Sequence, residues 1–591
     1  MEFRDLNRNG RLDPYEDPRR PLEERVDDLL SQLTVEEKAG LMYHAPIGIG
    51  SAGELLEEPA PFSPVPTPEL VCARLINHFN IYWSPGARET AAWHNRLQKL
   101  AQETRLGIPV TVSSDPRHGF SDNPATSMSS GALSAWPEPI GLAAAGDEEL
   151  VRAFGDIARR EYLALGIRAA LHPTADLCTE PRWARCSGTF GEDSELSSCL
   201  LLAYIRGFQG DELGPQSVAC MTKHFPGGGP QADGEDPHFA RGKDQVYPGG
   251  NFEYHLGPFE AAFAAGTAMV MPYYGRPVGT ELEEVGFGFN KQVITGLLRE
   301  RFGYDGVVCT DWGLVTDADL GDWVFYAKCW GVEDLSAADR VAKIIDAGCD
   351  QLGGENDPAL LVELVRSGRI SEERIDESVR RVLRVKFRLG LFDNPYIDED
   401  AAVQLAGRDD FRRAGEEAQR RSLVLLANDG LLPMRSRRRL YVEGVDAATA
   451  AQYGDVVESP AEADVALLRM VAPFEPREGF LESVFHQGSL EFPRTERDRI
   501  RAIAAQVPTV VDVFLDRPAI LTEIASSAAA LVGNFGAADA AVLDLVFGRF
   551  DPSGKLPFEL PSSMDAVLRQ LPDVPFDSEA PLYPYGHGLT Y

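Results

Sequence analysis

The chain of 591 residues is 44% apolar and 25% charged, an ordinary globular composition that at this length predicts two or more domains. Its 57 basic and 91 acidic residues give a formal net charge of −34, which argues against nucleic acid and anionic membranes as partners. The opening residues, MEFRDLNRNG, lack an apolar leader, and no stretch of about 18 apolar residues follows, so we expect a cytoplasmic protein with no membrane partner.

The eight cysteines are scattered and form no CxxC pair. Several lie inside apolar runs, so we expect buried free thiols in a reducing compartment rather than disulfides or a zinc site. They are Cys72, Cys178, Cys186, Cys199, Cys220, Cys309, Cys329 and Cys349.

Residues 5–16, DLNRNGRLDPYE, follow the pattern of a calcium loop. Oxygen-bearing groups recur at the spacing that a hard cation requires, and Gly10 stands where the loop turns sharply. The expected ligands are Asp5, Asn7, Asn9, the carbonyl of Arg11, Asp13 and Glu16. We predict a structural Ca²⁺ here and no catalytic cofactor. Too few residues precede the loop for a complete EF-hand, and the alternative is an Asx-rich turn that caps the next helix.

Thr34 and Glu37 form a capping box that predicts the start of a helix. From residue 107 onward, short apolar runs that end in polar or aromatic residues alternate with amphipathic helical sequence. The runs are GIPVTVSSD (107–115), IRAALHPTAD (167–176), SVACMTKHF (217–225), TAMVMPYY (267–274), GVVCTDW (306–312) and AGCDQLGG (347–354). Repeated βα units with polar residues after each strand are typical of a parallel barrel whose active site gathers at one end, although an open doubly wound sheet gives a similar rhythm.

The run 306–313, GVVCTDWG, is the strongest candidate for a catalytic segment. A buried, β-branched strand ends at Asp311 and Trp312, so a carboxylate lies beside a large ring. We interpret Asp311 as a nucleophile and Trp312 as a wall of its pocket; the alternative is an aspartate that caps the following helix.

The βα pattern pauses after LGLFDNPY and resumes in a second unit. Its candidate strands are RLYVEG, VALLRMVA, TVVDVFLD and AALVGNF, and residues 472–493 form a long insert that holds four glutamates. We predict a calcium-loop segment (1–20), a βα unit that is either a (β/α)8 TIM-like barrel or an open sheet (21–395), a linker (396–415) and an α/β sandwich with a mostly parallel sheet (416–591).

With these residues assembled, the chain resembles glycoside hydrolase family 3 in its two-domain form. The motifs that carry the resemblance occur in the family's order: DPRHG (115–119), EPRWAR (180–185), KHFPGGG (223–229), VMPYY (270–274), GVVCTDW (306–312), SLVLLANDGLLP (422–433), GRFDPSGKLPFELP (548–561) and YPYGHGLTY (583–591). Ala184 replaces the glycine that is usual in the second motif.

The resemblance implies a role for each matching residue. Asp311 is the nucleophile, Tyr274 donates a hydrogen bond to it, and Trp312 flanks the next subsite. The hydroxyls of the terminal sugar are expected to contact Asp115, Arg185, Lys223 and His224. Arg182 and Trp183 are expected to pack in the barrel, and His118 to be structural.

The acid/base residue departs from the commoner family patterns. Retaining hydrolysis needs an ionised carboxylate and a second, protonated group on the other side of the bond. The resemblance implies that the first unit is the (β/α)8 barrel and that a loop of the second domain supplies this acid/base group, and the insert there offers Glu475 first and Glu478 second. An alternative is Asp236-Pro237-His238, similar to the Asp-Ser-His dyad of the family's N-acetylglucosaminidase branch; that branch usually has PGHG where this chain has PGGG, and the second domain also counts against it. We otherwise predict His238 as a substrate contact.

The resulting prediction is an exo-acting, retaining β-glycosidase, most simply a β-glucosidase, acting on small or oligomeric β-glycosides. Within the same fold, the alternatives are β-xylosidase, β-galactosidase, N-acetylhexosaminidase and phosphorylase. Two alternatives belong to other functional classes: a non-catalytic carbohydrate-binding protein, and an enzyme that forms a Schiff base on Lys223. A homodimer is compatible with the sequence.

Overall fold

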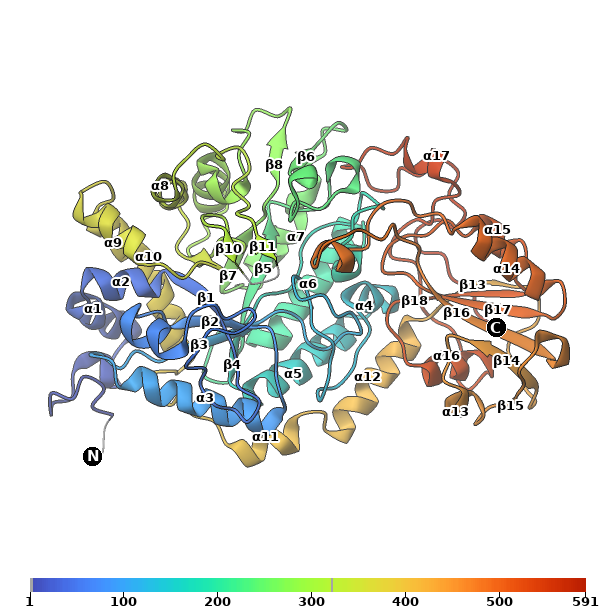
Figure 1. The fold of residues 1–591 in the computed structure, drawn as a ribbon, viewed down its shortest axis with the longest axis horizontal. Helices are drawn as coiled ribbons and strands as arrows, with labels where there is room; N and C mark the ends of the chain where they lie inside the picture. The colour runs from blue at the N-terminus through green and yellow to red at the C-terminus, as the bar shows by residue number, and fades with distance from the viewer. Residues whose placement is uncertain (1–3, 320–322) are drawn as a thin grey trace.

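A computed structural model describes residues 4–319 and 323–591 of the protein (Figure 1). Two units lie next to each other along the long axis: the blue-to-yellow part of the chain builds a barrel, and the orange-to-red part builds a second, open sheet. In these described ranges, none of the helices is long and apolar enough to cross a membrane.

The first unit is a closed barrel of eight parallel strands. In spatial order they are β12 (Leu352–Gly353), β1 (Tyr43–Ile47), β2 (His78–Ile81), β3 (Thr111–Ser114), β4 (Ile167–Ala170), β5 (Ala219–Phe225), β7 (Met269–Pro272) and β9 (Val307–Val308). The circle closes between β9 and β12, where the N–H of Gln351 donates to the Val308 carbonyl at 3.0 Å and the N–H of Thr310 donates to the Gln351 carbonyl at 2.9 Å. The predicted TIM-like barrel is therefore confirmed.

Helices cover the outer face of the barrel strands, and side chains that fill the barrel bury the inner face, which explains why most of the strands lie in apolar runs. The larger ones are α3 (Ala87–Gln102), α5 (Glu148–Ala164), α6 (Ser194–Gln209), α7 (Phe252–Ala264), α8 (Ala337–Ala347) and α10 (Glu372–Arg388). The others are α1 (Leu22–Gln32), α2 (Val35–Leu41), α4 (Pro139–Ala145) and α9 (Ala359–Arg366). The predicted capping box is present at the start of α2, where Thr34 accepts from the N–H of Glu37 and Glu37 accepts from the N–H of Thr34.

The second unit is a six-stranded sheet in the order β13 (Val424–Asn428), β18 (Ala530–Asn534), β17 (Thr509–Phe514), β16 (Val465–Val471), β14 (Arg439–Glu443) and β15 (Asp455–Val456). All neighbours are parallel except β13 and β18, which are antiparallel. Each face carries its own apolar cluster, covered by the helices α13 (Ala447–Ala450), α14 (Arg494–Ala504), α15 (Thr522–Ala525) and α16 (Asp539–Val546). A last short helix is α17 (Met564–Val567). The mostly parallel sandwich was also predicted correctly.

Residues 396–415, predicted as a linker, are largely helical. They contain α11 (Glu399–Leu405) and the start of α12 (Asp409–Ser422). Helix α11 packs against α3 and α5, and α12 packs against α4 and α16, so the connection itself joins the two units.

The prediction of eight free thiols was wrong for one pair. Cys178 and Cys186 form a disulfide across a Cα–Cα distance of 5.2 Å. Sequence spacing alone did not reveal the pair, because both residues lie in a loop that folds back on itself after β4. The other six cysteines are free; Cys72 and Cys199 among them are exposed, and the remaining four are buried.

Candidate active site

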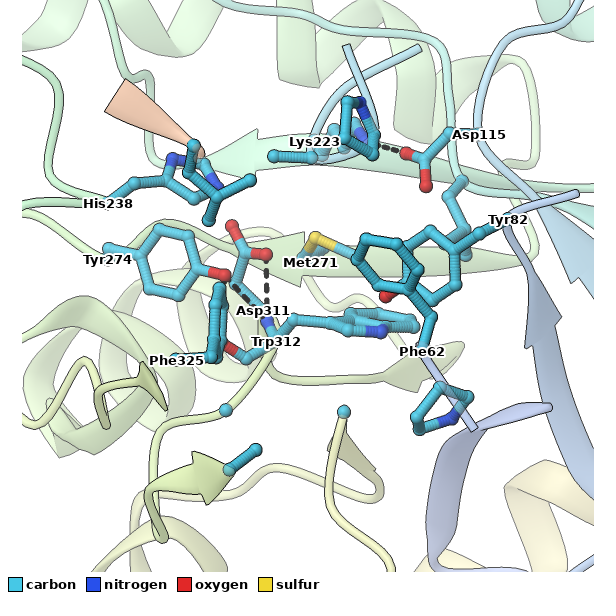
Figure 2. A pocket seen from close by; sticks show the side chains of 18 of the residues that line it. Phe62, Tyr82, Asp115, Lys223, His238, Met271, Tyr274, Asp311, Trp312 and Phe325 are labelled. Atoms are coloured by element: carbon cyan, nitrogen blue, oxygen red, sulfur yellow. Dashed lines mark hydrogen bonds and ion pairs between the residues drawn. The ribbon is translucent and has the colours of Figure 1, made fainter. Parts of the chain in front are cut away.

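A pocket opens at the carboxyl ends of the barrel strands and extends between the loops that follow them (Figure 2). It encloses about 860 Å³, part of which is open to solvent. The side chains that line it follow seven strands: Tyr82 after β2, Asp115 after β3, Leu171 after β4, His224 at the end of β5, Tyr274 after β7, Asp311 and Trp312 after β9, and Asn356 after β12. This is the end of a parallel barrel where catalytic groups gather.

Asp311 lies in this pocket with one carboxylate oxygen held and the other free. Oδ1 accepts a hydrogen bond from the N–H of Trp312 at 2.8 Å, whereas Oδ2 is buried and has no hydrogen-bond partner in the described part of the chain. The residue is 6% exposed. Burial raises the pKa of this carboxyl, and the charges of His238, Lys223 and Arg185 act in the opposite direction. A free, basic oxygen that faces a cavity is what a carboxylate nucleophile requires.

Tyr274 fixes the backbone beside this carboxylate. Its hydroxyl donates to the carbonyl oxygen of Trp312 at 2.8 Å and accepts from the N–H of Trp312 at 3.0 Å. Burial and the neighbouring Asp311 hold the pKa of the phenol well above its usual value, so the hydroxyl stays protonated. The tyrosine thereby keeps the segment after β9 in one conformation.

Two of the residues expected to contact a sugar, Lys223 and Asp115, lie together across the pocket from Asp311 (Figure 2). A third, His224, lies beside the nucleophile, with Nε2 3.9 Å from Oδ2 of Asp311. Lys223 Nζ lies 2.9 Å from Asp115 Oδ1, and both side chains are buried. Arg185 donates to Nε2 of His224 at 2.9 Å. Burial, helped by the charges of Arg185 and Lys223, holds the pKa of His224 well below its usual value, so the ring is neutral.

Asp176, which sequence reasoning did not select, fixes the tautomer of His224. It accepts a hydrogen bond from Nδ1 of His224 at 2.6 Å. Burial raises the pKa of its carboxyl to about 6, while the N–H groups of Gly228 and His224 act against this rise. Asp176 ends the predicted run 167–176, and that position after a barrel strand was the signal available.

His238 lines the pocket and is backed by a buried carboxylate. Its Nδ1 donates to Oδ1 of Asp236 at 2.6 Å, and Oδ2 of Asp236 accepts from Trp183 at 3.1 Å and from Tyr273 at 3.2 Å. Burial raises the pKa of Asp236, but the charge and hydrogen bond of His238 outweigh it and the pKa lies below its usual value. Nε2 of His238 makes no hydrogen bond within the described ranges.

Glu475 and Glu478 of the insert are not brought into the pocket. Both are exposed, and Glu475 accepts from the N–H of Ser489 at 3.2 Å on the side of the second unit. The insert reaches the pocket instead through Leu481.

The insert is tied to the barrel loop that carries His238. Arg477 donates to both oxygens of Glu235, at 2.6 and 2.7 Å, and the ring of Phe485 lies 4.9 Å from that of His238. The remaining expectations concern packing: Trp183 is fully buried, Arg182 pairs with Glu180, and His118 contacts the buried Glu161 at 3.0 Å.

The predicted calcium loop folds into a compact turn. Asn7 and Asn9 each donate an amide N–H to the same oxygen of Asp13, at 2.5 and 2.6 Å. If the side-chain amides of Asn7 and Asn9 flip, their oxygens take the positions of their nitrogens. These two oxygens and the carboxylate oxygen of Asp13 are then able to face a hard cation.

Other features of the loop fit a cation less well. Both oxygens of Glu16 accept main-chain N–H groups, from Leu6 at 2.6 Å and Asp13 at 3.0 Å, so this carboxylate is already engaged. Throughout residues 4–319 and 323–591, no three His, Cys, Asp or Glu side chains are arranged to hold a metal ion. Calcium binding stays a prediction.

The chain matches known proteins along nearly its whole length. Residues 85–385 match the model of the glycosyl hydrolase family 3 N terminal domain, and residues 450–591 match that of the family's C-terminal domain. The chain is 51% identical to beta-glucosidase C of Emericella nidulans, over 99% of this chain and 95% of the relative. It is 43% identical to the periplasmic beta-glucosidase/beta-xylosidase of Dickeya chrysanthemi, over 100% of this chain and 93% of the relative. The solved structure of the β-glucosidase EmGH1 from Erythrobacter marinus has the same fold, with a TM-score of 0.79 at 22% identity over 98% of this chain and 84% of that chain.

Proposed function

The chain belongs to glycosyl hydrolase family 3, and on that premise we propose that it is an exo-acting, retaining β-glucosidase. The observation that carries the proposal is Oδ2 of Asp311, which is buried without a hydrogen-bond partner in the described part of the chain and shares its pocket with the polar side chains of Asp115, Lys223 and Arg185. The terminal sugar lies in this inner part, where Asp115 accepts hydrogen bonds from its hydroxyls and Lys223 and Arg185 donate to them.

The reaction proceeds in two displacements. In the first, Oδ2 of Asp311 attacks the anomeric carbon, and the bond between that carbon and the leaving oxygen breaks as this oxygen takes a proton. In the second, water attacks the same carbon, gives up a proton, and releases Asp311 as a carboxylate. Two inversions retain the β configuration.

We assign the proton transfers to His238 rather than to Glu475 or Glu478. The imidazolium gives its Nε2 proton to the leaving oxygen, and the neutral ring then takes a proton from the attacking water. Asp236 supports this role because its ionised, buried carboxylate holds Nδ1–H and stabilises the imidazolium. Neither glutamate lines the pocket.

The test is covalent trapping. Treatment with 2-deoxy-2-fluoro-β-glucosyl fluoride, followed by intact-mass analysis and peptide mapping, is expected to give one fluoroglucosyl adduct on Asp311. An adduct on another residue, or none on a protein that hydrolyses aryl β-glucosides, would contradict the nucleophile assignment.

A β-xylosidase activity is the second candidate, and the observation that favours it is the dual name of the Dickeya chrysanthemi relative. The ratio of kcat/KM for 4-nitrophenyl β-glucoside and 4-nitrophenyl β-xyloside decides between them. A ratio above one supports the proposal, and a ratio below one supports the xylosidase.

A further inference from the structure

A chain of hydrogen bonds leads from Asp176 through His224 to Arg185 and passes beside the nucleophile. Nδ1 of His224 donates to Oδ2 of Asp176 at 2.6 Å, and Nε2, on the other side of the ring, accepts from Arg185 at 2.9 Å. Nε2 also lies 3.9 Å from Oδ2 of Asp311, the oxygen that has no hydrogen-bond partner among the described residues. One ring nitrogen therefore faces both the nucleophile and a residue expected to contact the sugar.

The other carboxylate oxygen of Asp176 is bound to the main chain. Oδ1 accepts the N–H of His224 at 3.1 Å and the N–H of Gly228 at 2.5 Å, and the aspartate is 1% exposed. The ring of Tyr273 packs against that of His224, with the ring centres 4.5 Å apart. The carboxylate and the imidazole are therefore held in one relative orientation, in which Oδ2 faces Nδ1.

This arrangement decides which nitrogen of the neutral ring carries the proton. An ionised carboxylate only accepts hydrogen bonds, so Asp176 places the proton on Nδ1 and leaves a lone pair on Nε2. The lone pair accepts from the guanidinium of Arg185, which only donates, and it gives no hydrogen bond to Asp311. With the proton on Nε2 instead, the ring and Arg185 would face each other as two donors. The ring could then also donate to the nucleophile, which stabilises its charged form before attack.

We propose that Asp176 is a positioning residue for the double displacement: by fixing the tautomer of His224, it holds Arg185 toward the sugar and keeps Oδ2 of Asp311 ready to attack. This rests on the proposed retaining mechanism and adds a residue to it. In the described part of the chain, the residues that line the pocket include His224 and Arg185 but not Asp176, which acts through the ring alone.

The variant Asp176→Asn tests the proposal because asparagine has nearly the same shape as aspartate. Its amide oxygen is expected to stay with the two main-chain N–H groups, since turning the amide would leave both of them buried without a partner. Its NH2 group then faces Nδ1 of His224 as a donor, and the ring proton moves to Nε2. We expect kcat/KM for 4-nitrophenyl β-glucoside to fall by about 10²–10⁴-fold, as for other aspartates that set the tautomer of an active-site histidine.

The variant Asp176→Ala separates control of the tautomer from support of the loop. Alanine removes both main-chain contacts but places no donor against Nδ1, so Arg185 keeps its acceptor on Nε2. We therefore expect kcat/KM of Asp176→Ala to be about 10-fold higher than that of Asp176→Asn. A residue that only supported the main chain would give the opposite order, because asparagine keeps those contacts and alanine loses them. An asparagine variant at least as active as the alanine variant would overturn the proposal.

The matched control is Asp233→Asn, the same change at an exposed position. Its side chain is 88% exposed and lies, like Gly228, in the loop that follows β5. We expect this variant to keep the kcat/KM of the wild type. A loss equal to that of Asp176→Asn would show that the loop, rather than the tautomer, is sensitive to the change, and would overturn the proposal.

Nuclear magnetic resonance reads the tautomer without turnover. In protein with isotopically labelled histidine, the ring nitrogens of His224 are assigned from the signals that disappear in His224→Gln. We expect the proton on Nδ1 in the wild type and on Nε2 in Asp176→Asn. A wild-type ring that carries its proton on Nε2 would overturn the proposal even if no variant of Asp176 folds, and so would an unchanged tautomer in Asp176→Asn.

The same measurement separates this proposal from the proposed function. The expected tautomers in a wild type that hydrolyses no β-glucoside would contradict the catalytic function and support the control of the ring by Asp176. Normal hydrolysis by a wild type whose ring carries its proton on Nε2 would overturn the positioning role alone.

Discussion

At the scale of single residues, the proton-transfer role proposed for His238 depends on how its ring is held. The ring is fixed at Nδ1 by a carboxylate that is itself held by Trp183 and Tyr273. Such a pair resembles the base and its orienting carboxylate in other enzymes, where the carboxylate sets the tautomer and stabilises the charged ring. A neutral or misoriented ring would leave the departing oxygen without a proton.

Replacing His238 therefore affects poor leaving groups most. In His238→Asn, kcat/KM for phenyl β-glucoside is expected to fall by about 10²–10⁴-fold. The kcat/KM for 2,4-dinitrophenyl β-glucoside is expected to stay within about 10-fold of wild type, because its leaving group, 2,4-dinitrophenolate, departs without a proton. The matched variant Glu475→Gln is expected to change neither value. If Glu475→Gln shows the selective loss instead, the glutamate predicted first from the sequence is the acid.

Individual residues of the pocket were predictable where they lie at, or within a few residues of, the carboxyl end of a barrel strand. Asp115, Lys223, His224 and Asp311 do so, and the barrel brings them together. The proposed acid was harder to predict, because Glu475, Glu478 and His238 lie inside long loops, several residues after the strands β16 and β5 that precede them. Their position depends on docking between domains, and a single sequence contains no direct signal of that docking.

Among the elements, the insert at 472–493 connects the two domains over the active site. The carboxylate of Glu235 accepts two hydrogen bonds from Arg477 and one from Arg241, so a small charge network holds the insert against the barrel. Asn123 adds a contact to the carbonyl of Val484 at 3.2 Å. The position of Leu481 at the pocket depends on this attachment.

Breaking the network is expected to loosen the pocket without unfolding the protein. In Arg477→Met, KM for an aryl β-glucoside should rise by about 3–10-fold with little change in kcat, because the leaving-group side becomes less ordered. Limited proteolysis should cut residues 472–493 faster than in wild type. Arg494→Met, an exposed arginine just after the insert, is the control. Wild-type kinetics in Arg477→Met would mean that apolar contacts alone hold the insert.

The calcium loop is a second element whose role can be measured. If Asn7, Asn9 and Asp13 turn their oxygens to a cation, Ca²⁺ added to chelator-treated protein should raise the melting temperature by a few degrees, because the ion binds only the folded loop. The rise should disappear in Asp13→Ala and persist in Glu24→Gln, an exposed change on α1. No rise in the wild type would mean that the Asx-rich turn is complete without metal.

Strand prediction failed for β1 and β2 for a physical reason. Both carry polar residues that are buried because they bond to one another inside the barrel: His44 contacts Ser113 at 2.7 Å, and Ser113 donates to Asn80 at 3.0 Å. Periodicity marks apolar strands, and the other six barrel strands, β3, β4, β5, β7, β9 and β12, fall in the predicted runs. A strand that carries buried polar residues has a sequence like that of a loop, and its burial can be recognised only once the hydrogen-bond partners of those residues are known.

At the scale of the whole molecule, Glu192 lies at the junction of the two domains. Its carboxylate accepts from the N–H groups of Glu559 and Phe576, at 2.7 and 2.8 Å, and its own N–H donates to Pro557 at 3.2 Å. Burial raises the pKa of this carboxyl to about 8. The folded protein therefore holds a proton here that the unfolded chain releases at lower pH.

This proton makes stability depend on pH in a defined direction. Because the folded pKa is raised, the contribution of Glu192 is complete below the unfolded value of 4.5 and is lost as the pH rises through about 8. We expect the melting temperature of wild type, relative to Glu192→Gln, to fall between pH 5 and 9. Glu195→Gln, exposed and nearby, should follow wild type at every pH. Parallel curves for Glu192→Gln and wild type would contradict the assignment.

The two-domain division was predictable because each unit repeats its own βα pattern. The disulfide and the helical connection were not, since both depend on three-dimensional proximity: Cys178 and Cys186 meet across a folded loop, and α12 packs against both units. The composition indicated a globular protein of two or more domains, but it held no information about these contacts.

The closure of the barrel also has a consequence for how the protein is made. Gln351, beside β12, donates to the carbonyl of Leu41, 310 residues earlier in the chain. A ribosome that adds about 5–20 residues per second needs roughly 15–60 s to supply this partner. Throughout that interval β1 is an open edge whose free N–H and C=O groups can pair with other nascent chains. Chaperones that cover such edges should therefore increase the yield of folded enzyme without changing its stability once folded.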